Sequence, residues 1–371
     1  MLNMPIIQTK YTADPAPLVY NDTLYLYTSH DEDDAEGFKM QDWLLYTTTD
    51  MVNWQDRGAV ASLKDFKWYK NNNGAWAQQV VHRNGKFYMY CPIHGNGIGV
   101  LVADTPYGPF EDPIEKPLVW QKEHWNDIDP TVFIDDDGQA YMYWGNPDVY
   151  YAKLNEDMIS TSGPIVKLPK QQHYQEGPWC YKRNGKYYMA FASTCCPEGI
   201  GYAMSDNPTG PWTTMGYIME PTHRSRGNHP GIIDFKGKSY VFGLNYDILR
   251  IETAQHHERR SVSVAEMKYN EDGTIQEVVP TLRGVGPVLA SSKVEIDRYS
   301  SIEGASIEYL DSSDPFKGWK TVFAKAGDKV CFNDLDFGEN HPVQFVVRMK
   351  SPQGGKIGVT VGETYEYLLP R

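Results

Sequence analysis

Cysteine is scarce in this sequence, and the few cysteines show no pattern that would bind a metal. The 371 residues include five cysteines, an odd number without paired metal-ligand spacing, so we expect reduced thiols. Long apolar runs are missing as well, and the sequence gives no sign of contact with a membrane. The first ten residues lack the charged start and apolar stretch of a secretory signal, which favours a cytoplasmic protein or one trimmed of its leader.

Positive charge is also in short supply. The chain carries 35 Lys and Arg against 48 Asp and Glu, a formal net charge of -13. A nucleic-acid groove needs clustered Lys and Arg to displace counterions, so we exclude nucleic acid as a partner. The roughly 3.6-residue period of a helix is largely absent from residues 10–285, which argues against an α-helical domain there.

Aromatic residues are plentiful, with 26 Tyr and 10 Trp. A chain of this length forms one large closed β fold or two domains, with a substantial core in either case. The composition suits a β protein whose pockets stack flat, partly apolar ligands such as sugar rings.

One pattern recurs five times between about residues 10 and 285. Each unit has a polar or aromatic residue, an apolar run, a tight turn, and then aromatic residues that alternate with apolar ones. The turns contain pairs such as Asn84-Gly85 and Asn184-Gly185, which predict β-hairpins. A repeat of roughly 50 residues built from four short strands is a propeller blade. We therefore predict an all-β fold, with a five-bladed β-propeller over residues 1–287.

The inner strand of each propeller blade runs along the central channel, so the residues that begin these strands converge at one mouth. The first residues of the five units are Asp14, Trp76, Asp129, Glu176 and His229. We expect these side chains to ring a single funnel.

The pattern changes after Gly286-Pro287. Four later segments have the alternating pattern of strands in a β-sandwich: residues 294–297, 329–332, 343–348 and 356–361. We therefore predict a second, β-sandwich-like module over residues 288–371.

Three of the five first residues are acids at one equivalent position of the repeat: Asp14, Asp129 and Glu176. Two carboxyl groups on either side of one bond can cleave a glycoside, because one activates water while the other protonates the leaving oxygen. A third carboxylate nearby raises the pKa of the acid. The alternative is that these acids cap turns or bind a structural cation.

The same residues resemble the signature blocks of glycoside hydrolase family 43, in order and with similar spacing. The blocks are Asp14 in Ala-Asp-Pro-Ala-Pro, Trp76 in Gly-Ala-Trp-Ala, Asp129 in Ile-Asp-Pro-Thr, and Glu176 in Glu-Gly-Pro. The resemblance covers about residues 10–285. It implies a five-bladed propeller that hydrolyses arabinose- and xylose-containing polysaccharides with inversion of configuration. It also implies Asp14 as general base, Glu176 as general acid, and Asp129 as the residue that tunes the pKa of the acid and orients it.

The resemblance extends to an arginine and a metal. Arg259-Arg260 is similar to a segment in which one arginine reaches the sugar hydroxyls; we favour Arg259, with a solvated surface pair as the alternative. Many members of the family hold a calcium ion or a water cluster in the channel, often through a histidine. Asn245 stands where a Tyr-His pair often occurs, so we expect His257, or else His256, to substitute as the ligand. We expect no organic cofactor.

Further candidates for sugar binding are aromatic. Trp76 is expected to stack against the sugar, with packing between blades as the alternative. His229 opens the fifth unit and is expected to line the pocket, or else to be a buried structural histidine. His30 and His94 follow inner hairpins and are candidates for the rim.

The C-terminal segments 294–297, 335–338 and 354–357 resemble the first and middle strands of a family 6 carbohydrate-binding module. The match covers about the first two-thirds of such a module. A sandwich without its final strands leaves open edges, so we expect this part to pack on the propeller and not to bind sugar independently.

Taken together, these features predict an inverting exo-glycoside hydrolase that releases xylose, arabinose or both from xylan- or arabinoxylan-derived oligosaccharides. A funnel with one deep end favours exo action, and xylo- and arabinoxylo-oligosaccharides are then the partners. An endo-arabinanase is the nearest alternative and would need an open groove. A glycoside phosphorylase also stays open, whereas a fructan-cleaving propeller would show different acidic blocks. The alternative outside the enzymes is a non-catalytic sugar-binding propeller. A sugar-binding protein has no need to keep all three acids, so their presence argues against it.

Overall fold

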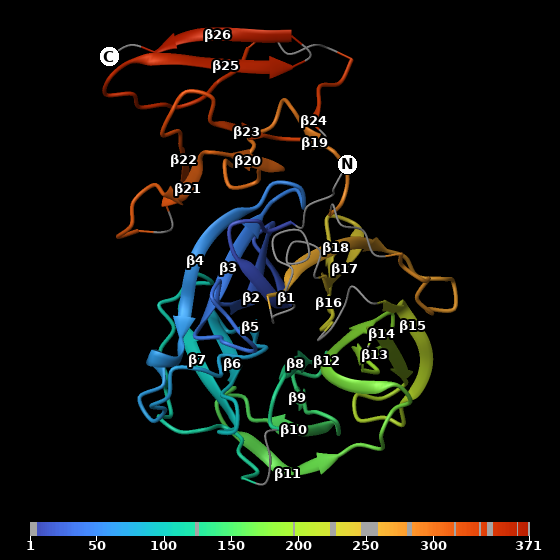
Figure 1. Ribbon diagram of the computed structural model, residues 1–371. Helices are drawn as coiled ribbons and strands as arrows, with labels where there is room; N and C mark the ends of the chain where they lie inside the picture. Colours follow the sequence, from blue (N-terminus) through green and yellow to red (C-terminus); the bar gives the residue numbers. More distant parts are fainter. Residues whose placement is uncertain are drawn as a thin grey trace.

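The computed structural model confirms an all-β protein. It describes residues 6–122, 126–195, 197–222, 228–245, 259–279, 284–314, 317–333, 335–339, 344–361 and 363–369. This part of the chain contains no α-helix, and its 3-10 helix η1 spans Leu63–Asp65. None of the described helical residues forms a helix long and apolar enough to span a membrane. Figure 1 shows five small sheets around an axis, so the five-bladed β-propeller is also confirmed.

Each blade is an antiparallel sheet of consecutive strands with the first strand innermost. Blade 1 comprises β1 (Tyr11–Tyr20), β2 (Thr23–Asp31), β3 (Asp42–Thr48) and β4 (Gln55–Ser62). Blade 2 comprises β5 (Gln79–Arg83), β6 (Lys86–Pro92) and β7 (Ile98–Ala103). Blade 3 comprises β8 (Thr131–Ile134), β9 (Ala140–Trp144), β10 (Tyr150–Leu154) and β11 (Thr161–Lys167). Blade 4 comprises β12 (Tyr174–Arg183), β13 (Lys186–Ser193), β14 (Glu198–Ser205) and β15 (Thr213–Thr222), and blade 5 comprises β16 (Gly231–Phe235), β17 (Lys238–Asn245) and β18 (Ser261–Met267).

The hairpins that open the blades follow from their turn residues. Asn84 and Gly85 have φ of 52° and 75°, and Asn184 and Gly185 have φ of 48° and 76°. Two successive left-handed residues are typical of a type I′ turn, whose twist matches that of the flanking strands. In blades 2 and 4 the Asn-Gly pairs therefore determine where the inner strand ends and its neighbour begins.

The ring closes by contact between the first blade and the last. The backbone N–H of Thr12 in β1 donates to the carbonyl of Arg260, at 3.0 Å, just before β18. The N–H of Val262 in β18 donates to the hydroxyl of Thr12 at 3.2 Å. Between blades 4 and 5 the indole N–H of Trp179 donates to the carbonyl of Ile232 at 3.0 Å. Residues from the two ends of the propeller sequence thus meet at the axis.

The residues after the propeller form short strand pairs. The strands are β19 (Val288–Leu289), β20 (Ser301–Glu303), β21 (Ser306–Tyr309), β22 (Trp319–Val322), β23 (Lys329–Cys331), β24 (Leu335–Asp336), β25 (Gly355–Val361) and β26 (Glu363–Leu369). They pair as β19-β24, β20-β23, β21-β22 and β25-β26. Figure 1 shows them as a separate layer beside blade 1. The likeness to a carbohydrate-binding module and the boundary at residue 288 stay predictions.

This C-terminal layer docks on blade 1 and on the segment that precedes it. Arg298 Nε donates to the carbonyl of Val52 at 3.1 Å, and the Tyr299 hydroxyl donates to the carbonyl of Gln8 at 3.3 Å. The backbone N–H of Asp56 in β4 donates to Asp297 Oδ2 at 3.3 Å. The expected packing of this segment on the propeller is therefore present.

The cysteines differ in part from the expectation. Cys91, Cys180 and Cys331 carry free thiols, and the first two are buried. Cys195 is disulfide-bonded, so the expectation of reduced thiols was wrong at this position. Cys195 is exposed in the loop after β13 and is not packed in the core.

Candidate active site

Asp14 and Asp129 lie on left-handed backbone at the inner edges of blades 1 and 3. Asp14 has φ 52° and lies in a bulge of β1, where the pairing with β2 shifts between Ala13 and Ala16. Asp129 has φ 57° and lies two residues before β8. Asp tolerates this conformation better than most residues, and a following proline disfavours the right-handed helical alternative. Both side chains are buried, with 4% and 3% of their residue surface exposed.

Glu176 occupies a different position in its blade. The left-handed residue before the proline is Gly177, with φ 60°, and Glu176 precedes it. A Cβ at position 177 would lie 2.8 Å from the ring of His229, so glycine makes room for the imidazole. The prediction of one equivalent position therefore holds for Asp14 and Asp129 but was wrong by one residue for Glu176.

A single imidazole contacts all three carboxylates. His229 lies just before β16 and is 8% exposed. Its Nδ1 is 3.2 Å from Asp14 Oδ1, while its Nε2 is 3.5 Å from Glu176 Oε1 and 3.7 Å from Asp129 Oδ2. The structure thus brings together four of the five first residues of the units, and Asp14 and Glu176 approach His229 from its opposite nitrogens.

The members of this cluster shift the pKa values of one another. Burial lowers the pKa of His229, but Asp129, Asp14 and Glu176 outweigh it and raise the pKa to about 10. Burial raises the pKa of Asp129 to about 8, aided by Glu176 and Asp14 and opposed by His229. Asp129 Oδ2 accepts from the Gly177 N–H at 3.1 Å, while its buried Oδ1 has no hydrogen-bond partner among the described residues. These shifts favour the charged imidazole of His229 and the neutral carboxyl of Asp129.

Glu176 departs from the expectation for an acid in a carboxylate cluster. Burial raises its pKa and Asp14 adds to this, but hydrogen bonds from His229 and Asn146 outweigh them, so the pKa is lowered. The Asn146 Nδ2 group donates to Glu176 Oε2. The prediction of a raised pKa for the acid was therefore wrong, because the donors of His229 and Asn146 stabilise the Glu176 carboxylate.

Asp14 is surrounded by donors. The Ser29 hydroxyl donates to Asp14 Oδ2 at 2.7 Å, and Arg260 Nη1 lies 3.2 Å from Asp14 Oδ1. Asp31 holds Arg260 in place: it accepts from the Arg260 backbone N–H at 2.8 Å, from Nε at 2.9 Å and from Nη2 at 3.0 Å. Asp31 is fully buried, so this fork of charge-assisted bonds fixes the guanidinium against Asp14.

The structure places Arg260, and not the favoured Arg259, at the carboxylates. Arg259 donates from Nε and Nη2 to the carbonyl of Ala35, at 3.3 Å and 3.2 Å. The two residues directly precede β18, where successive side chains point to opposite faces. One arginine therefore faces the axis while its neighbour is directed to the loop around Ala35.

Aromatic rings form a wall beside this arginine. The Arg260 guanidinium lies 5.2 Å from the ring centre of Phe38, and Phe38 lies 5.2 Å from the ring of Trp76. Trp76 in turn stacks on His94 at 4.3 Å with an interplanar angle of 7°. The Trp43 indole donates to the carbonyl of Trp76 at 2.7 Å, which fixes the backbone there. The wall gives an apolar face on which a sugar ring can stack.

His30 belongs to a neighbouring group. Its Nδ1 lies 2.7 Å from Asp42 Oδ1 and 3.7 Å from Glu32 Oε1. Burial lowers the pKa of His30, but the hydrogen bond with Asp42 outweighs burial and raises it. A role for His30 at the rim stays a prediction, because its ion pairs within the described part of the chain are with these two acids.

Two groups in the described residues are close enough to surround a cation: His30, Glu32 and Asp42, and Asp129, Glu176 and His229. Calcium takes six to eight oxygen ligands, whereas each group offers two carboxylates and an imidazole nitrogen. In the second group the nitrogens of His229 already face carboxylates as donors. Neither set fits calcium. His257, the predicted metal ligand, lies outside the described residues.

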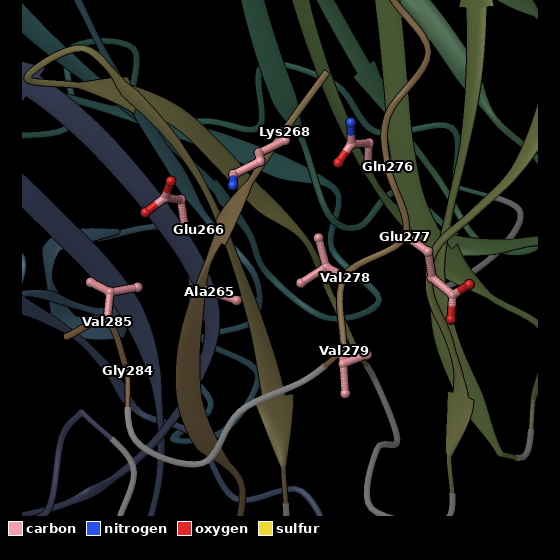
Figure 2. A pocket seen from close by; sticks show the side chains of 9 residues that line it. All are labelled: Ala265, Glu266, Lys268, Gln276, Glu277, Val278, Val279, Gly284 and Val285. Atoms are coloured by element: carbon pink, nitrogen blue, oxygen red, sulfur yellow. The ribbon is translucent and has the colours of Figure 1, made fainter. Parts of the chain in front are cut away.

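A hollow of about 320 Å³ lies away from this cluster (Figure 2). Its lining residues are Ala265, Glu266, Lys268, Gln276, Glu277, Val278, Val279, Gly284 and Val285. Glu266 is paired with Lys238 at 2.9 Å. The lining includes none of the three acids, His229 or Arg260, so the hollow is separate from the candidate active site.

Several residues of this cluster were not anticipated. Phe38 stands alone among polar residues, and an exposed aromatic in a polar loop is the signal that could have identified it. Asp31, Ser29 and Asn146 carry no comparable mark, because their roles depend on contacts between blades or neighbouring strands that no short motif encodes.

Known proteins are similar to this chain. The family model described as glycosyl hydrolases family 43 matches residues 2–275. An arabinoxylan arabinofuranohydrolase of Paenibacillus polymyxa is 30% identical over 96% of this chain, and the chain spans 64% of the length of that protein. A xylosidase/arabinosidase of Bacteroides ovatus is 32% identical over 73% of this chain and 95% of its own length.

Solved structures agree with these relatives. An α-L-arabinofuranosidase of Clostridium thermocellum has 38% identity and a TM-score of 0.62, covering 76% of this chain and 97% of its own. A family 43 arabinoxylan arabinofuranohydrolase of Bacillus subtilis has 27% identity and a TM-score of 0.73, covering 90% and 80%. With the family match over most of the propeller and the carboxylates gathered at its axis, the chain belongs to glycoside hydrolase family 43.

Proposed function

We propose that this chain is an inverting exo-glycoside hydrolase that releases xylose, arabinose or both from xylan- or arabinoxylan-derived oligosaccharides. The observation that carries the proposal is the placement of Asp14 and Glu176 on opposite nitrogens of His229. Inversion needs two carboxyl groups roughly 6.5 to 9.5 Å apart, with room for a water molecule on one side of the sugar. His229 contacts both acids and holds them apart, which supports this assignment.

Asp14 is assigned as the general base. Its donors are the Ser29 hydroxyl, Arg260 and His229, and a carboxylate that accepts from several donors is well oriented to take a proton from water. Arg260 is held from behind by Asp31, so the position of the base depends on a buried ion pair.

Glu176 is assigned as the general acid, with Asp129 as its partner. Burial raises the pKa of Asp129, and His229 contacts both carboxylates. A leaving sugar oxygen that approaches Glu176 displaces water and favours its neutral form. Protonation of Glu176 then comes from within the cluster. After the reaction Asp14 carries the proton of the attacking water. His229 contacts both Asp14 and Glu176 and therefore connects the base with the acid for the return of a proton.

The sugar is assigned to the wall of Phe38 and Trp76, beside Arg260. A planar donor fork suits the vicinal hydroxyls of a pentose, and the aromatic rings suit its apolar face. The relatives support this substrate class: a family 43 enzyme of Xanthomonas citri has been solved with xylotriose and with xylose, at 28% identity.

Calcium enters the proposal as a structural ion only. Family resemblance implies it, but the donors around the three acids do not suit it, so no catalytic step is assigned to a metal.

The test uses 4-nitrophenyl β-D-xylopyranoside and α-L-arabinofuranoside, with wild type and with Glu176→Ala. Wild type should release nitrophenol from at least one substrate, and NMR of the first sugar formed should show the inverted anomer. Glu176→Ala should lose most of its activity. Some residual activity should remain, because nitrophenolate departs without protonation. No release by wild type from either sugar would overturn exo action and point to an endo-arabinanase or to a sugar-binding propeller.

A further inference from the structure

A side-chain amide connects the assigned acid to its own neighbour in sequence. Asn146 is 5% exposed, and its Nδ2 group donates to Glu176 Oε2. Its Oδ1 accepts from Gln175 Nε2 at 3.1 Å. Gln175 and Glu176 are adjacent in β12, so Asn146 bridges two successive side chains of that strand.

The backbone that carries Asn146 is held on both sides. Gly145 follows β9 and has φ 125°, and a Cβ there would lie 2.1 Å from the carbonyl oxygen of Asp148. The Gly145 N–H donates to the carbonyl of Ile128 at 3.0 Å. The Gly145 carbonyl accepts from the Tyr174 hydroxyl at 2.6 Å. The turn is therefore fixed against the inner strands of blades 3 and 4.

The orientation of the amide follows from these contacts. Because Oδ1 of Asn146 is occupied by the Gln175 amide, the NH2 group is the end that faces Glu176. An N–H donor facing Oε2 requires that oxygen to act as an acceptor. The other oxygen, Oε1, lies 3.5 Å from His229 Nε2, so both oxygens of the Glu176 carboxylate are held by neighbouring groups.

We propose that Asn146, oriented by Gln175, is a positioning residue that fixes the orientation of the Glu176 carboxyl group and stabilises its charged form. This inference rests on the proposed function, because it concerns the acid of that reaction. The benefit is twofold: the carboxyl group is held in one orientation towards the substrate, and a donor on Oε2 stabilises the carboxylate that proton transfer leaves behind.

The test is Asn146→Leu, which keeps much of the side-chain volume and removes the amide. With xylobiose, whose leaving group needs protonation, kcat should fall roughly 10- to 100-fold, the range of a hydrogen bond to a charged group. With the 4-nitrophenyl glycoside the loss should be several-fold smaller, and KM should change little. Loss of a donor to the carboxylate makes the acid weaker, so the alkaline limb of the pH profile should move to higher pH. The groups that face Glu176 across the cluster, His229, Asp129 and Asp14, are unchanged in this variant.

A second variant removes the support without touching Asn146. Gln175→Leu should give a smaller effect in the same direction, and the double variant should lose less than the sum of the two in free energy. Asn155→Leu is the matched control, because the Asn155 side chain is exposed in blade 3, with bonds to Ser160 and Thr161. It should leave both substrates unaffected.

Equal losses on both substrates with an unmoved pH profile would show a structural role and overturn the inference. So would full activity of a folded Asn146→Leu. If Asn146→Leu does not fold, Gln175→Leu alone tests the inference. The loss of its activity on xylobiose is then compared with the loss on the 4-nitrophenyl glycoside. A wild type inactive on every glycoside overturns the proposed function itself, which is a different outcome from an active wild type with an indifferent Asn146.

Discussion

Asp297→Asn should stabilise this protein at neutral and alkaline pH. Asp297 lies where the C-terminal layer meets blade 1 and is 7% exposed. Its Oδ2 accepts from the backbone N–H of Asp56, a fully buried acid, and its Oδ1 has no hydrogen-bond partner among the residues described. Burial, followed by the charge of Asp56, raises the pKa of Asp297 to about 7.

The magnitude follows from the difference between the folded and unfolded chains. The ordinary pKa of 3.8 applies after unfolding, whereas the folded chain keeps the proton until about pH 7. The folded state therefore binds more protons between these values, and stability is lost as the pH rises through this window. Above it the cost is complete, at about 4 kcal/mol for a shift of this size. Asparagine cannot ionise, so the variant avoids this free-energy cost of ionisation, which is up to about 4 kcal/mol.

Thermal unfolding followed by tryptophan fluorescence measures the effect at pH 4, 6 and 8.5. The Tm of Asp297→Asn should lie close to that of wild type at pH 4, exceed it at pH 6 by roughly two-thirds of the full difference, and reach the full difference of several degrees at pH 8.5. Asp311→Asn is the control: its partner Lys317, at 2.6 Å, lowers the pKa of Asp311, so its removal should not stabilise at any of these pH values. A Tm difference that does not depend on pH, or a less stable Asp297→Asn at pH 8.5, would refute the reasoning.

Three further predictions concern the candidate active site. Arg260→Ala should lower the free energy of unfolding by about 3 to 5 kcal/mol in urea titrations, because Asp31 stays buried without its partner; an unchanged midpoint would contradict this. Trp76→Ala should lower kcat/KM on the 4-nitrophenyl glycosides roughly tenfold, the scale of one lost aromatic contact, whereas Trp120→Ala, at an exposed indole, should not. Dialysis against EDTA should leave hydrolysis largely intact, since the donors around Glu176 do not suit calcium; abolished activity that calcium alone restores would count against this.

The blades could be predicted from the sequence because their signals are local. Asn-Gly pairs impose left-handed turns, and alternating aromatic and apolar residues on either side of them pair as hairpins. The same locality explains why Asp14 and Asp129 were found at one position: each precedes a proline on left-handed backbone.

The features that the sequence did not predict depend on contacts between segments that are distant in sequence. The offset of Glu176 by one residue arises because Gly177 must make room for His229, which comes from another blade. The choice between Arg259 and Arg260 depends on which face of β18 meets the axis, and two adjacent arginines carry no mark of that. Asn146 depends on the turn after β9 and on Tyr174, so its role becomes visible only when the blades are assembled.

Closure of the ring and assembly of the site involve the same residue. The Arg260 carbonyl receives the N–H of Thr12 from the first blade, and its guanidinium reaches Asp14 across a sequence separation of 246 residues. Contacts this distant in sequence form late, because the intervening chain must be ordered first. A folding chain with four finished blades therefore has no competent base. The delay before hydrolysis begins during refolding then measures the time at which the last blade docks on the first. Variants that close the ring sooner should show a shorter delay.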